Sequence, residues 1–122
     1  MTDFWCRLAT AQLDLPEQIA VDPDGHPVFM SRRVWERHIL AKRAYMTGLR
    51  HLLICAIESP DVTEHEHGGA IRYFAKIPED GFGALSRHWL KVVVKYVYPP
   101  VRDGARTGLV STARAARARE LR

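Results

Sequence analysis

The amino-acid sequence predicts an α+β fold in which an N-terminal hairpin and two helices pack on one face of an antiparallel β-sheet. Three observations lead to this prediction. A turn signal separates two short apolar runs near the N-terminus, helical periodicity follows, and alternating β-branched stretches fill much of the C-terminal half. Helices that precede a set of strands are typical of an antiparallel sheet with one face covered and the other open.

The hairpin is predicted from residues 22–26, which read Asp-Pro-Asp-Gly-His and lie between apolar runs at residues 19–21 and 28–30. Aspartate, proline and glycine in this order favour a tight turn. Ser31 follows directly. Its hydroxyl can accept a backbone N–H two or three residues further on, so we expect it to cap a helix that begins at Arg32.

A longer helix is predicted over residues 42–58, where apolar side chains recur every three or four positions. Gly48 weakens the middle of this helix by about 1 kcal/mol relative to alanine. Pro60 ends it, because proline cannot continue a helix and disfavours helical geometry in the residue before it.

Three strands are predicted at residues 70–77, 89–98 and 107–112. The middle one is the strongest signal, because it is β-branched or aromatic almost throughout. Its alternation places Lys91 and Lys95 on the face opposite to the buried side chains.

The length of 122 residues predicts a single domain. We assign it to residues 1–112, with residues 1–30 as its N-terminal hairpin region, and treat residues 113–122 as a basic Ala/Arg-rich tail. No run approaches the roughly 18 apolar residues of a membrane span, and residues 1–15 lack the pattern of a signal peptide. The sequence therefore predicts a cytoplasmic protein with no membrane partner.

The charge is unevenly distributed along the chain. The net charge is +4, yet residues 1–30 hold one arginine against five acids, and residues 102–122 hold six arginines against two acids. Such asymmetry favours a polyanionic partner, most often RNA or DNA, for the basic part. The alternative is an ordinary solvated surface that is rich in arginine.

Short motifs follow one another in the order of the predicted elements. They are Val34-Trp-Glu-Arg-His38, Ser59-Pro-Asp-Val62, Arg72-Tyr-Phe-Ala-Lys76, Lys91-Val-Val-Val-Lys95 and Val110-Ser-Thr-Ala113. With this element order the chain resembles the barnase/EndoU/colicin/RelE-like nuclease fold, in particular small phage-associated, toxin-like nuclease families. The resemblance implies a metal-independent endoribonuclease without a cofactor, a toxin or phage effector that acts on RNA. It also suggests an acidic antitoxin or immunity protein as a partner.

The resemblance implies site residues on the motifs above. The catalytic candidates are His38, Tyr73, Lys76 and Thr112. The candidates for nucleic-acid binding are Arg72, Lys91, Lys95, Ser111 and Arg114. Metal-independent RNA cleavage needs a base for the 2′-hydroxyl, an acid for the 5′-oxygen and cations at the phosphate, which are roles that histidine, lysine and arginine perform well.

Other interpretations remain open. His38 can be a structural histidine at a helix end, the strand cations can be a solvated sheet face, and the chain can be a non-catalytic RNA- or protein-binding module of the same fold. Residues 64–67, which read Glu-His-Glu-His, could begin a metal site. No third ligand is set by spacing, so we predict no metal and interpret this segment as a polar loop.

Overall fold

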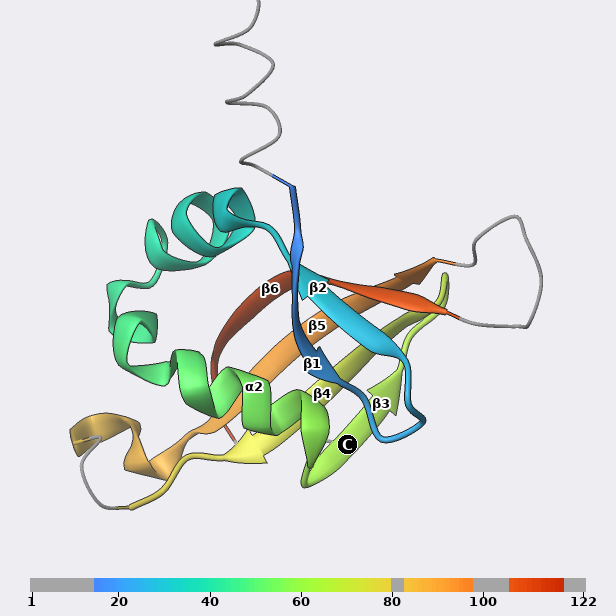
Figure 1. Ribbon diagram of the computed structural model, residues 1–122. Helices are drawn as coiled ribbons and strands as arrows, with labels where there is room; N and C mark the ends of the chain where they lie inside the picture. The colour runs from blue at the N-terminus through green and yellow to red at the C-terminus, as the bar shows by residue number, and fades with distance from the viewer. Residues whose placement is uncertain (1–14, 80–82, 98–105, 118–122) are drawn as a thin grey trace, which may run out of the picture.

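A six-stranded mixed β-sheet with a helical layer on one face makes up the fold (Figure 1). The structure is a computed structural model and describes residues 15–79, 83–97 and 106–117. The elements are β1 (Glu17–Val21), β2 (Pro27–Met30), the π-helical η1 (Val34–Leu40), the 3-10 helix η2 (Ala44–Leu49), α2 (Arg50–Glu58), β3 (Val62–His65), β4 (Ala70–Lys76), the 3-10 helix η3 (Gly83–Arg87), β5 (Trp89–Val97) and β6 (Thr107–Ala116). The α+β class therefore holds.

The sheet has the strand order β1-β2-β6-β5-β4-β3. Its strands pair antiparallel except for β2 and β6, which run parallel, with Val28 opposite Gly108 and Phe29 opposite Leu109. The sheet is thus mixed, whereas a purely antiparallel sheet was expected. The turn at residues 22–26 joins β1 to β2, and this pair lies beside β6 instead of standing apart from the sheet.

The helical layer differs from the two regular helices that the sequence predicts. Ser31 does cap its first turn, because the backbone N–H of Val34 donates to the Ser31 hydroxyl at 3.1 Å. That turn widens into a π-helix, in which the Ala41 N–H donates to the Glu36 carbonyl at 3.0 Å. Arg43 is extended, with φ −144° and ψ 82°, and separates η1 from η2.

Only residues 50–58 of the predicted long helix are α-helical. Residues 44–49 wind more tightly as a 3-10 helix that contains Gly48, a residue that adds little helical stability. The Thr47 hydroxyl donates to the Ala44 carbonyl at 2.9 Å within it. Packing decides this geometry, because both Met46 and Leu49 of η2 reach the buried core.

The core lies between the helical layer and one face of the sheet. Its helical side comes from η1, η2 and α2, and its sheet side from alternate residues of the central strands. As predicted from the alternation of β5, four of its side chains are buried there, namely Leu90, Val92, Val94 and Tyr96. In Figure 1, α2 crosses this face of the sheet.

The sheet contains one strand that the sequence does not predict, and another strand that is longer than predicted. The segment predicted as a polar loop before β4 contains the edge strand β3, in which Glu64 pairs with Arg72. β6 continues through Ala116, which pairs with Trp89. Residues 113–116 of the predicted tail are therefore part of the sheet, while residues 118–122 of the tail and residues 1–14 of the N-terminal region lie outside the described residues.

Candidate functional site

The face of the sheet turned away from the core carries most of the candidate binding residues. Directly opposed residues of antiparallel strands point to the same side of a sheet. Phe74, Lys91 and Arg114 form one such row across β4, β5 and β6, and Arg72, Val93 and Thr112 form the next. We call this side the open face, since every described helical segment contributes instead to the core on the other side. It is not exposed throughout, because Phe74 and Ala116, which lie on it by their pairing, are 0% and 1% exposed.

Five cations lie on the open face. They are Arg72 and Lys76 of β4, Lys91 and Lys95 of β5, and Arg114 of β6. Lys76 and Lys95 are exposed, while the other three are partly buried. With about 3.4 Å per residue along a strand, Lys91 and Lys95 stand about 14 Å apart along β5. The strand register therefore brings together the cations that the sequence placed at even spacing.

Arg72 lies beside two glutamates of the open face that were not among the predicted site residues. Its Nε lies 2.8 Å from Oε1 of Glu66 and 3.5 Å from Oε1 of Glu64. Glu64 is its direct cross-strand partner, and the Glu66 backbone N–H donates to the Ala70 carbonyl at 2.8 Å, which fixes the end of β3. The signal in the sequence was the i, i+2 spacing of the two glutamates, which places both on one face of an extended strand.

Apolar side chains accompany the cations on the open face. Leu109 is the direct partner of Lys95 and is 37% exposed, and Val97 lies two residues further along β5 and is 49% exposed. At the other end of β5 the half-buried Trp89 shares the face with Lys91. Exposed apolar groups beside cations are a combination that can contact both the bases and the phosphates of a nucleic acid.

The predicted catalytic residues are not brought together. Lys76 and Thr112 lie on the open face. His38 is an exposed residue of η1, in the helical layer. Tyr73 alternates with Arg72 and points into the core, where it is 2% exposed. The expectation that Tyr73 faces a substrate is therefore wrong, because the strand period of two puts it on the opposite side from its neighbours.

Ser111 occupies a special position in β6. Val93 pairs with Thr112 and Val94 with Val110, so Ser111 is the extra residue of a β-bulge. Along β5 the bulge lies between the positions of Lys91 and Lys95. Bulges of this kind locally bend a strand and redirect its side chains.

A buried polar network on the core side holds Tyr73 in place. The Tyr73 and Tyr96 hydroxyls are 2.6 Å apart, and the Tyr96 hydroxyl donates to Oδ2 of Asp22 at 2.8 Å. Oδ1 of Asp22 accepts the backbone N–H groups of Asp24 and His26 at 3.0 and 2.8 Å. Burial raises the pKa of each tyrosine hydroxyl above the ordinary value for tyrosine. Both hydroxyls therefore stay protonated and act as donors. The network joins the β1–β2 turn to the sheet.

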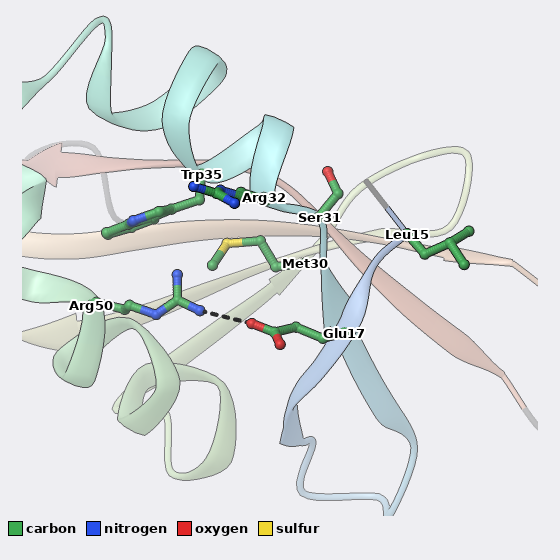
Figure 2. Close-up of a pocket in the computed structure, with 7 residues that line it drawn as sticks. All are labelled: Leu15, Glu17, Met30, Ser31, Arg32, Trp35 and Arg50. Atoms are coloured by element: carbon green, nitrogen blue, oxygen red, sulfur yellow. Dashed lines mark hydrogen bonds and ion pairs between the residues drawn. The ribbon is translucent and has the colours of Figure 1, made fainter. Parts of the chain in front are cut away.

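A pocket of about 170 Å³ lies where β1 and β2 meet the helical layer (Figure 2). Figure 2 shows Glu17 pointing toward Arg50, with 3.4 Å between Oε1 and Nη2. The Arg50 guanidinium also lies over the Trp35 ring, 4.9 Å from its centroid. Arg32, the other cation of the pocket, pairs with Glu36 at 2.9 Å. Both cations of the pocket therefore have a carboxylate partner.

Within the described residues no three metal-ligating side chains come together. The 64–67 segment divides instead, since Glu64 and Glu66 pair with Arg72 and His65 takes the other side of β3. No helix in the described part of the chain is long and apolar enough to cross a membrane.

Comparison of the chain with protein-family models, with curated proteins and with solved structures finds no match.

Proposed function

We propose that this protein binds single-stranded RNA on the open face of its sheet. The observation that carries the proposal is the shared face of five cations from three adjacent strands. Each cation that neutralises a phosphate releases condensed counterions, and this release is the main source of affinity for nucleic acids. The exposed side chains of Val97 and Leu109 can also contact unstacked bases. Single-stranded RNA presents such bases, whereas duplex RNA does not.

Neutralising Lys91 and Lys95 together should weaken RNA binding in a salt-dependent way. For a single strand each lost phosphate contact reduces the slope of log K against log salt by about 0.7, so Lys91→Gln/Lys95→Gln should reduce it by about 1.4. The measurement is fluorescence anisotropy with a labelled oligouridylate over a series of salt concentrations.

The matched control is Arg37→Gln/Lys42→Gln, which removes the same charge from exposed positions of the helical layer. Equal effects of the two variants would mean that only net charge matters, and the open face would not be the site. A wild-type protein that binds duplex RNA or DNA more tightly than single-stranded RNA would also contradict the proposal.

Metal-independent cleavage of the bound RNA is a second candidate function. The observation in its favour is that Lys76 and Thr112, two of the catalytic candidates, share the open face with the binding cations. A lysine there could stabilise the charge that develops on the phosphate during attack by the 2′-hydroxyl. Under this candidate function the protein is a toxin with an acidic antitoxin partner, as the resemblance implies.

We expect such cleavage to proceed in EDTA and to leave 2′,3′-cyclic phosphate ends. Lys76→Gln should lower the rate at least about tenfold, as is usual for groups that stabilise transition-state charge. His38→Ala should leave the rate within about twofold, since general acid–base groups must reach the reacting atoms. Gel analysis of RNA fragments measures both. A strict requirement for added divalent metal, or a wild-type rate for Lys76→Gln, would exclude this mechanism.

A further inference from the structure

The arrangement of Glu64, Glu66 and Arg72 is unexpected on a face that binds a polyanion. Arg72 is the planar donor best suited to a phosphate, yet its Nε already faces one carboxylate oxygen at 2.8 Å and another at 3.5 Å. Two carboxylates around one guanidinium leave this corner of the open face with a local excess of negative charge.

The contact is built into the sheet. The side chain of Glu64 is only 14% exposed, and those of Arg72 and Glu66 are 31% and 35% exposed. Partly buried ion pairs are screened less by salt than exposed ones. Register fixes Glu64 opposite Arg72, so the carboxylates are in position without any ligand.

We propose that Glu64 and Glu66 act as an intramolecular competitor for the phosphates of bound RNA. They act by occupying the Nε edge of Arg72, which is then not available to a phosphate. Bound RNA is thereby confined to the other cations of the open face, and its affinity is kept below what the open face could give. This inference rests on the proposed function of RNA binding and concerns the regulation of that site.

Removing both carboxylates should release Arg72 for one further phosphate contact. For Glu64→Gln/Glu66→Gln we expect the salt slope to steepen by about 0.7, which corresponds to roughly fivefold tighter binding at 0.1 M salt. The glutamine side chains keep the size of the glutamates, and thermal unfolding of the variant shows whether the sheet is intact. The probe is the same labelled oligouridylate.

A second pair of glutamates provides a matched control. Glu36→Gln/Glu58→Gln raises the net charge by the same amount and also releases an arginine, because Glu36 pairs with Arg32 at 2.9 Å. Both glutamates are exposed residues of the helical layer. RNA affinity should change less than about twofold in this control, since it adds no phosphate contact on the open face.

A third comparison tests the part of Arg72 itself. In an Arg72→Gln background the two glutamate substitutions should lose most of their effect, as expected for residues that act through one partner. An unchanged gain in that background would overturn the proposal, as would an equal gain in the control pair. Weaker RNA binding by Glu64→Gln/Glu66→Gln would also overturn it, because the glutamates would then position Arg72 for RNA.

The outcomes separate this inference from the proposed function. If wild type binds RNA and the glutamate variant binds no tighter, only the competitor is refuted. If wild type shows no binding and the glutamate variant binds, the two glutamates block binding completely. The competitor proposal is then supported, and the proposal that the wild-type protein binds RNA is refuted. If neither protein binds, both proposals fail.

Discussion

Replacing Asp22 with alanine is expected to lower the free energy of unfolding by about 2–4 kcal/mol, because a buried group left without its hydrogen-bond partner costs about 1–3 kcal/mol. The carboxylate accepts three hydrogen bonds, two from the backbone of its own turn and one from the Tyr96 hydroxyl. The backbone donors are partly buried and water can replace part of the loss there, but the Tyr96 hydroxyl lies in the buried network. Urea unfolding followed by circular dichroism measures the change.

Asp24 provides the control for this substitution. It lies two residues away in the same turn and carries the same charge, but it is exposed. Asp24→Ala should therefore change the free energy of unfolding by less than about 0.5 kcal/mol. Equal destabilisation by the two variants would mean that charge or turn propensity, and not the Asp22–Tyr96–Tyr73 network, stabilises this end of the sheet.

Gly108→Ala is the second substitution with a large expected effect on stability. A Cβ atom at this position would lie 2.8 Å from Val94 Cγ1, 3.0 Å from Tyr96 Cε1 and 3.1 Å from Val28 Cγ2. All three neighbours are buried, so they have little room to move, and overpacking of this kind costs about 1–3 kcal/mol. The same urea titration tests it.

Gly48→Ala is the matched control, because a Cβ atom there meets nothing within 4 Å. In a helical position alanine is favoured over glycine by up to about 1 kcal/mol, so this variant should be neutral or more stable. A neutral result for Gly108→Ala would show that Val94, Tyr96 and Val28 can move to accept the methyl group, and the close packing around this glycine would not be needed for stability.

The sequence predicts the arrangement of the candidate site only where that arrangement depends on a single strand. The alternation of β5 and the spacing of Arg72 and Lys76 each place two cations on one face of their own strand. The sequence could not show that Glu64 and Glu66 lie beside Arg72, because that requires β3 to pair with β4 in one particular register. Tyr73 is a catalytic candidate through the family resemblance alone, whereas the strand period of two places it on the face opposite to Arg72.

What the sequence alone determined is the set of features that depend on neighbours a few residues away: the turn at residues 22–26, the cap at Ser31 and the two faces of β5. The tertiary structure decided the rest. The Asp22–Tyr96 hydrogen bond joins residues that are 74 positions apart, and the packing of β2 and β5 around Gly108 leaves little space for a side chain there. Such contacts reflect how whole strands pack, and packing overrides local preference wherever the two compete.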